Sequence, residues 1–173
     1  MLTKDNRFRV LRTFFDYPEK EFHIRELARI TKLSPPGIMK IVKSLEKEHL
    51  LISKKGNIIT SIHASKSEKF LQLKRFINLY NIYECGFIEF LIDEFSPNAI
   101  VLFGSYAKGD DISTSDVDIF VLAKEKEIEL KRYEIILKRK INILFESDIK
   151  TVPKELLNNI INGVVVYGYL KVF

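Results

Sequence analysis

Two aspartates that stand two residues apart, Asp116 and Asp118, are the residues of this chain best placed to do chemistry. They open a β-prone segment at residues 117–122, and side chains two apart on a strand project from the same face. Carboxylate oxygens are the ligands that hard divalent cations prefer. The pair therefore predicts a metal site of the kind that neutralises phosphate charge.

A Gly-Ser turn precedes the aspartates. Gly104 and Ser105 follow an apolar run at residues 99–103 that is typical of a buried strand. We expect a brief helical segment at 106–108, capped by Ser105 and ended by a left-handed Gly109. Backbone N–H groups and a hydroxyl at a helix start favour a polyphosphate, so the turn predicts a nucleotide-binding element.

Written together, the segment GSYAKGDDISTSDVD is Gly-Ser, ten residues and then Asp-x-Asp. With Gly109 and Ser115 inside it and an apolar strand on each side, it resembles the signature of the DNA polymerase β-like nucleotidyltransferase superfamily. The resemblance covers residues 97 to about 168, including the segment NGVVVYG at 162–168. It is greatest to the minimal nucleotidyltransferases of prokaryotes, some of which are antitoxins beside HEPN-type toxins.

The resemblance implies a reaction and its parts. A nucleoside monophosphate would pass from an NTP, such as ATP, to an acceptor, and pyrophosphate would leave. Asp116 and Asp118 would hold two Mg²⁺ ions, and Gly104 and Ser105 would fix the triphosphate. Paired carboxylates suit this chemistry because the metals they hold neutralise charge on the attacking and leaving oxygens.

The third carboxylate of the family is where this chain departs from the pattern. Asn142, on a predicted strand at 141–145, stands at the position that we align to it. An amide oxygen can ligate Mg²⁺ but brings no charge and is a poor base. Glu146 shares the strand face of Asn142 and could replace it if the strand is offset or bent. Otherwise Asp118 or solvent deprotonates the acceptor, or the domain binds nucleotide with little turnover.

The first third of the chain predicts a different module. Apolar residues at helical spacing indicate helices over 6–15, 24–30 and about 35–49, the last with Ser34 as N-cap. A hairpin follows, with Lys55, Gly56 and Asn57 at its turn. This order resembles a winged helix-turn-helix with a wing tip at 54–57, fused ahead of the transferase as in archaeal members.

The excess positive charge of the chain is concentrated in this module. Residues 1–65 hold 13 Lys and Arg against 7 Asp and Glu, whereas residues 66–173 hold 15 against 16. Lysines on the third helix and on the wing would contact the phosphates or base edges of duplex DNA. The residues predicted to bind DNA are Lys40, Lys43, Lys54 and Lys55. The alternative is a small helical domain that docks a protein and never touches DNA.

The predicted fold class is α+β, in three parts. Residues 1–65 form the winged helix-turn-helix, 66–96 form apolar linking helices, and 97–173 form a minimal nucleotidyltransferase domain with a mixed sheet flanked by helices. The 173 residues are 46% hydrophobic and 29% charged, which excludes disordered and collagen-like classes. The single cysteine, Cys85, excludes an internal disulfide, and no stretch predicts a membrane span, so we expect a cytoplasmic protein without a membrane partner.

Three functions compete at this point. The first is a transferase that modifies a macromolecule, for example a hydroxyl group of a HEPN-type partner protein, while its winged domain binds DNA or docks the substrate. The second is a DNA-binding regulator that senses NTP without turnover, which Asn142 favours. The third, modification of an antibiotic, lacks an added substrate lobe in so short a chain. A homodimer is compatible with all three.

Overall fold

A computed structural model describes residues 5–56 and 60–172 of the chain. The chain divides into two compact units, Met1–Gln72 and Leu73–Phe173, and the division falls within helix α4, Glu68–Glu84. The predicted three-part boundaries at residues 65 and 96 remain a prediction. Every helix among the described residues is too short or too polar to cross a lipid bilayer.

The first unit consists of three helices followed by a two-stranded antiparallel hairpin, before α4 begins. Its elements are α1 Asn6–Asp16, α2 Ile24–Thr31, α3 Pro35–Lys47, β1 Leu51–Lys55 and β2 Thr60–Ala64. The hydroxyl of Ser34 accepts a hydrogen bond from the Gly37 N–H at 3.3 Å, so α3 begins where the sequence predicts. Phe14, Leu27 and Ile38 are buried in the core of this unit.

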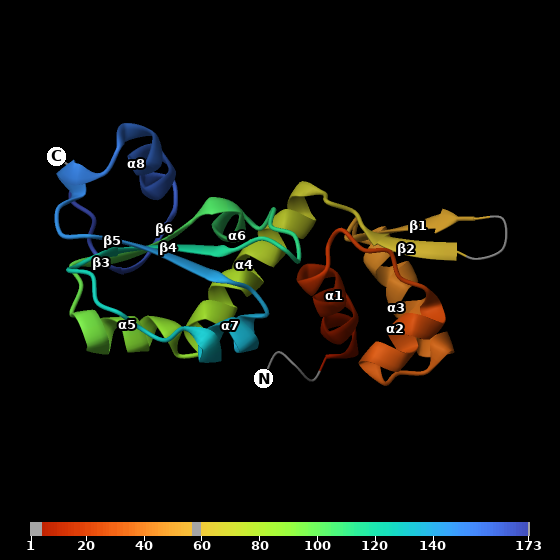
Figure 1. Ribbon diagram of the computed structural model, residues 1–173. Coiled ribbons are helices and arrows are strands. Elements are labelled where there is room, and N and C mark those ends of the chain that lie inside the picture. Colours follow the sequence, from red (N-terminus) through yellow and green to blue (C-terminus); the bar gives the residue numbers. More distant parts are fainter. Residues whose placement is uncertain (1–4, 57–59, 173) are drawn as a thin grey trace. The chain divides into compact units, whose positions relative to one another are not determined.

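The second unit contains a four-stranded mixed sheet and the helices that cover it (Figure 1). After α4 its elements are α5 Phe87–Phe95, β3 Ala99–Phe103, α6 Gly104–Lys108, β4 Val117–Leu122, α7 Lys131–Leu137, β5 Ile141–Glu146, the 3-10 helix η2 Ile149–Thr151, α8 Lys154–Ile161 and β6 Val164–Gly168. The strand order is β5-β4-β3-β6. Only the β4 and β5 pair is parallel, since β3 runs antiparallel to both β4 and β6.

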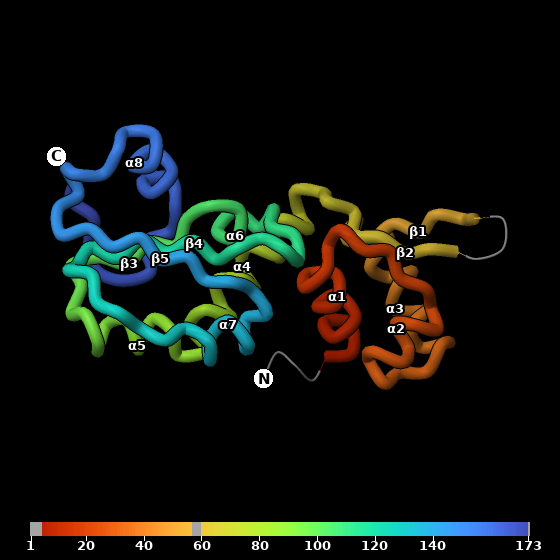
Figure 2. The backbone as a smooth tube through the Cα atoms, in the orientation of Figure 1, coloured from red at the N-terminus to blue at the C-terminus, as the bar shows by residue number. Residues whose placement is uncertain are grey.

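Both faces of this sheet are apolar, and different helices cover them. Ile100, Ile119 and other residues of one face pack with the buried side chains of α5, α6 and α7. On the opposite face, Val101 and Phe120 pack with Ile160 of α8. The backbone trace shows β3, β4 and β5 side by side between α8 and the pair α5 and α7 (Figure 2). The unit is therefore an α+β domain with a mixed sheet, as the sequence predicts.

Candidate functional site

The candidate site is built on neighbouring strands, β4 and β5. Asp118 is the second residue of β4 and lies on the face that carries Phe120. In the parallel register Asp118 pairs with Asn142, so the two side chains project from the same face. The Asn142 Nδ2 donates a hydrogen bond to Asp118 Oδ1 at 3.2 Å. The residue aligned to the missing third carboxylate therefore lies beside Asp118.

Gly104 brings the end of β3 close to the same carboxylate. It has a φ of +72°, a left-handed conformation that L side chains rarely adopt. A Cβ at this position would lie 3.2 Å from Asp118 Cγ and still nearer to Asp118 Oδ2. The glycine of the Gly-Ser turn thus leaves the space that the Asp118 side chain occupies.

The helix after this turn begins earlier than predicted. Helix α6 starts at Gly104, and its N-cap is Phe103, which makes no side-chain capping bond. The prediction that Ser105 caps the helix is therefore wrong, because the positive φ of Gly104 lets the chain turn into the helix at once. Gly109 has a φ of 79° at the C-cap, as predicted.

A cavity of about 450 Å³ opens beside Asp118. The residues lining it come from β3, β4, β5, α6 and α8, and they are Phe103, Gly104, Lys108, Asp118, Asn142, Ile143, Leu144, Leu156 and Asn159. Its size is in the range of small-ligand pockets, roughly 300–1,000 Å³. The cavity combines a carboxylate, an ammonium group and two amides, which is a donor set suited to a metal-bound phosphate ester.

Asp116 lines a different cavity from Asp118. It precedes β4, which begins at Val117, and its side chain is exposed. It lines a second cavity, of about 350 Å³, together with Lys131, Glu134 and Lys140. The ladder with β5 begins where Val117 pairs with Ile141, so Asp116 stands directly ahead of the strand, and a shared face for the two carboxylates stays a prediction. Asp116 and Asp118 thus line two different cavities.

Glu146 stands at the other end of β5. It is four residues beyond Asn142, a separation of about 13 Å at the usual strand rise. Its Oε2 accepts a hydrogen bond from the Thr151 hydroxyl at 2.8 Å, and it does not line the cavity of Asp118. β5 pairs with β4 continuously from Ile141 to Glu146, so no offset brings the Glu146 carboxylate to the site.

The oxygen donors of Asp116, Asp118 and Asn142 are those that a Mg²⁺ ion prefers, so the residues fit the cation that the resemblance implies. They supply two carboxylates and one neutral amide. In residues 5–56 and 60–172 there is no cluster of three or more His, Cys, Asp or Glu side chains that could hold a metal. The site is thus poorer in negative charge than a three-carboxylate site.

A buried polar network, which the sequence reasoning missed, holds the loop between α6 and β4. Lys74 of α4 is fully buried, forms an ion pair with Asp111 and donates a hydrogen bond to the Asp111 carbonyl at 2.8 Å. Asn78 donates to Asp111 Oδ1 at 2.7 Å, and Arg139 Nη2 lies 3.4 Å from Asp111 Oδ2. Burial lowers the pKa of Lys74, while the Asp111 carboxylate opposes that shift. One feature of the sequence could have indicated that Lys74 is buried: at helical spacing it shares a face with the apolar residues Phe70 and Ile77.

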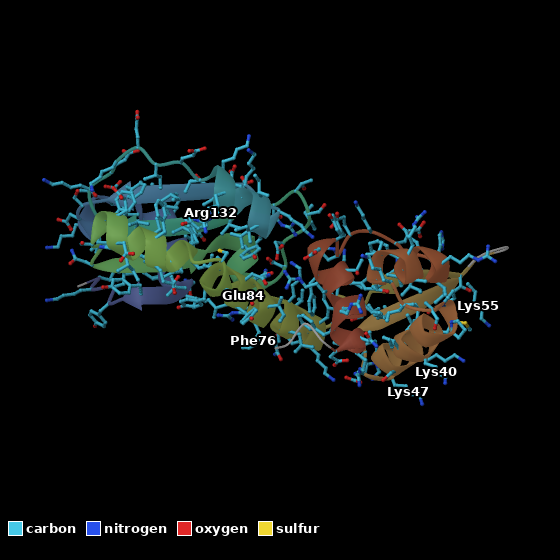
Figure 3. All side chains as sticks on the ribbon, turned by 90° about the horizontal axis from the view of Figure 1, so that it is seen from below. Lys40, Lys47, Lys55, Phe76, Glu84 and Arg132 are labelled. Atoms are coloured by element: carbon cyan, nitrogen blue, oxygen red, sulfur yellow. The ribbon has the colours of Figure 1, made fainter. Side chains whose placement is uncertain are left out.

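The lysines predicted to bind DNA are all exposed in the first unit. Lys40 and Lys43 lie on α3, and Lys54 and Lys55 end β1. Figure 3 shows Lys40 and Lys47 along α3 and Lys55 at the end of the hairpin. Asn57, predicted as part of the wing tip, lies outside the described residues.

A comparison with curated proteins found no match to this chain. Among solved structures, a mutant of ZitR from Lactococcus lactis aligns with 16% identity and a TM-score of 0.39 over 50% of this chain. The chain spans 60% of that protein's chain, and the likeness carries no argument at this TM-score.

A family model matches most of the second unit. Residues 87–170, from the first residue of α5 to just beyond β6, match the family described as Polymerase beta, Nucleotidyltransferase. The matched segment contains Gly104, Asp118 and Asn142 and the sheet that brings them together. The match supports the assignment of this segment to the polymerase beta nucleotidyltransferase superfamily.

Proposed function

We propose that this protein is a Mg²⁺-dependent nucleotidyltransferase that moves a nucleoside monophosphate from an NTP to a macromolecular acceptor. The observation that carries the proposal is the position of Asp118, which lies against Gly104 and lines a cavity of about 450 Å³ within the segment that matches the family model. A protein acceptor such as a HEPN-type partner, and an antitoxin-like role, are consistent with the resemblance to minimal nucleotidyltransferases.

The residues take distinct roles in this proposal. Gly104 and Ser105 bind the triphosphate, and Asp118 and Asp116 orient the reacting groups. These two carboxylates would hold Mg²⁺, which supplies charge neutralisation on the transferred phosphoryl group when bound. Asn142 positions Asp118 through its hydrogen bond and adds an amide donor. Asp118 is then the carboxylate best placed to accept the proton of the acceptor hydroxyl.

The test is a transfer assay with two labels. The full chain is incubated with Mg²⁺, lysate of its own host and ATP, GTP, CTP or UTP labelled on either the α- or the γ-phosphate. Nucleotidyl transfer puts the α-label, and not the γ-label, on a macromolecule, and it releases pyrophosphate. An Asp116→Ala, Asp118→Ala variant serves as the blank. Transfer of the γ-label would contradict the proposal, as would α-label transfer that persists in the blank.

Asn142→Asp is expected to strengthen the metal site. The exposed position accepts the change without repacking, and a third carboxylate should tighten Mg²⁺ binding by about tenfold and raise transfer. Calorimetric titration with Mg²⁺ and steady-state kinetics measure the two effects. Glu146→Gln is the matched control and should leave both unchanged, because Glu146 lies outside the cavity. Loss of transfer in that control would assign the third position to Glu146 instead.

The second candidate function is a DNA-binding regulator that binds nucleotide without turnover. The neutral side chain at Asn142 favours it, because the site then has one carboxylate fewer. So does the first unit, whose three helices and hairpin have the order of a winged helix-turn-helix with exposed lysines on α3 and β1. Such a module can place α3 in the major groove of duplex DNA. NTP binding without transfer of the α-label would make this the better reading.

Exchange of Lys40, Lys43, Lys54 and Lys55 for glutamate should abolish duplex binding. Each phosphate contact contributes about −0.9 to the slope of log K against log salt, so four contacts give a slope of about −3.6. Fluorescence anisotropy with a labelled duplex measures affinity at several salt concentrations. The control exchanges exposed lysines of the second unit, Lys124, Lys150, Lys154 and Lys171, for the same change in net charge. Equal affinity in the two variants would leave the first unit as a protein-docking module.

A further inference from the structure

Helix α4 carries two adjacent basic residues in opposite environments. Lys74 is fully buried against Asp111, whereas Arg75 is exposed. Arg75 lines a small cavity of about 60 Å³ together with Gly104 and Lys108. It therefore faces the turn that begins the candidate nucleotide site, although α4 precedes the segment that matches the family model. Phe76, the next residue, marks this part of α4 in Figure 3.

Hydrogen bonds from Lys74 and Asn78, which lie one helical turn apart on α4, fix the position of Arg75. Lys74 Nζ donates to the Asp111 carbonyl at 2.8 Å, and Asn78 Nδ2 donates to the Tyr106 carbonyl at 2.9 Å. Asn78 also donates to Asp111 Oδ1, so one face of α4 is tied both to α6 and to the loop that follows it. Because these contacts are buried, the backbone of Arg75 is held in place relative to the Gly-Ser turn.

The positively and negatively charged side chains around Gly104 are separated from one another. The small cavity is lined by Arg75 and Lys108 and contains no carboxylate among its lining residues. Within the described part of the chain, neither of these cations forms an ion pair. The larger cavity shares Gly104 and Lys108 with it and has Asp118 on its other side. A ligand that bridges the two cavities would meet a carboxylate at one end and two cations at the other.

We infer that Arg75 and Lys108 bind the β- and γ-phosphates of the NTP, so that α4 completes the nucleotide site. The inference rests on the proposed function and names the groups that hold the leaving pyrophosphate. A guanidinium binds phosphate oxygens through two parallel N–H bonds, which a single ammonium group cannot do. Arg75 thus makes the site select a triphosphate over a monophosphate, and it belongs to a helix outside the segment that matches the family model.

The experiment compares ATP and AMP binding to the full chain in the presence of Mg²⁺ by calorimetry. Arg75→Ala should weaken ATP binding about tenfold or more, since charged hydrogen bonds to the terminal phosphates are lost, and should leave AMP binding unchanged. Arg75→Lys should fall between the wild type and Arg75→Ala. Arg132→Ala removes an exposed arginine on α7 (Figure 3) and is expected to bind ATP like the wild type.

The possible outcomes are distinguishable. Wild-type affinity for ATP in Arg75→Ala would overturn the inference and leave the proposed function intact. Equal weakening of ATP and AMP would also overturn it, because it would show that Arg75 only supports the fold; a thermal melt of each variant reports that effect directly. Failure of the wild-type chain to bind any of the four NTPs would overturn the proposed function itself, and the inference with it.

Discussion

Replacing Gly104 with alanine should lower nucleotidyl transfer by about 100-fold or more, because misplacement of a reacting group by about 1 Å costs that much. The added Cβ would lie 3.2 Å from Asp118 Cγ and closer still to Asp118 Oδ2. The carboxylate must then swing away from the cavity that it lines or push β4 from its place. Steady-state kinetics with the labelled NTP and acceptor measure the loss.

Gly86→Ala is the matched control for this change. Gly86 has a φ of +76°, almost that of Gly104, but an added Cβ there meets nothing within 4 Å. Both variants therefore have the same left-handed strain, roughly 1–2 kcal/mol, and only Gly104→Ala displaces Asp118. Gly86→Ala should lower the melting temperature and keep transfer. If Gly104→Ala loses no more activity than Gly86→Ala, the Asp118 carboxylate is not part of the reacting site.

Asp111→Ala should destabilise the second unit by about 3–5 kcal/mol, the usual cost of breaking a buried ion pair by removing one partner. The change leaves the ammonium group of Lys74 fully buried without its counter-charge and deprives Asn78 of an acceptor. Chemical denaturation measures the free energy of unfolding. Asp110→Ala, at the exposed neighbouring aspartate, should change it by less than about 0.5 kcal/mol.

Two further measurements identify the cause of that loss. Lys74→Met combined with Asp111→Ala should recover part of the stability, because the buried ammonium group is removed, while the buried Arg139 still lacks the Asp111 carboxylate. The deficit of Asp111→Ala alone should shrink as the pH rises. Burial lowers the pKa of Lys74 and Asp111 raises it, so loss of Asp111 lowers the folded-state pKa of Lys74 further. Between the folded-state pKa values of the variant and the wild type, Lys74 is neutral only in the folded variant, which therefore gains stability with rising pH while the wild type does not. A deficit that does not depend on pH would point to lost packing rather than to buried charge.

The elements of the site could be predicted where the signal is local. The run at 99–103 and the segment at 117–122 are strands with the predicted bounds, because continuous apolar residues between turn residues leave few alternatives. Ser34 caps α3 as predicted, since its hydroxyl and the following prolines act within one turn. Asn142, which the strand pattern and the family's residue order align with the third carboxylate, pairs with Asp118 in the parallel register.

Other features depend on contacts that are distant in sequence or on a single backbone angle. Lys74 and Asp111 lie 37 residues apart, and only the fold shows that they pair. The start of α6 at Gly104 follows from one positive φ, which sequence alone does not give. Asp116 stands ahead of β4 because the parallel ladder with β5 begins at Val117, a fact that strand propensity does not contain.

The register between β4 and β5 also bears on how this protein can change over generations. Ile141 and Ile143 pack into the sheet's apolar face and fix the alignment, while Asn142 between them is exposed. Position 142 can therefore exchange its side chain without disturbing the fold. A single-base substitution converts an asparagine codon into an aspartate codon. A lineage that carries this domain therefore has a neutral and a charged side chain beside Asp118 within one point mutation of each other, and under the proposed function these give a weaker and a stronger metal site.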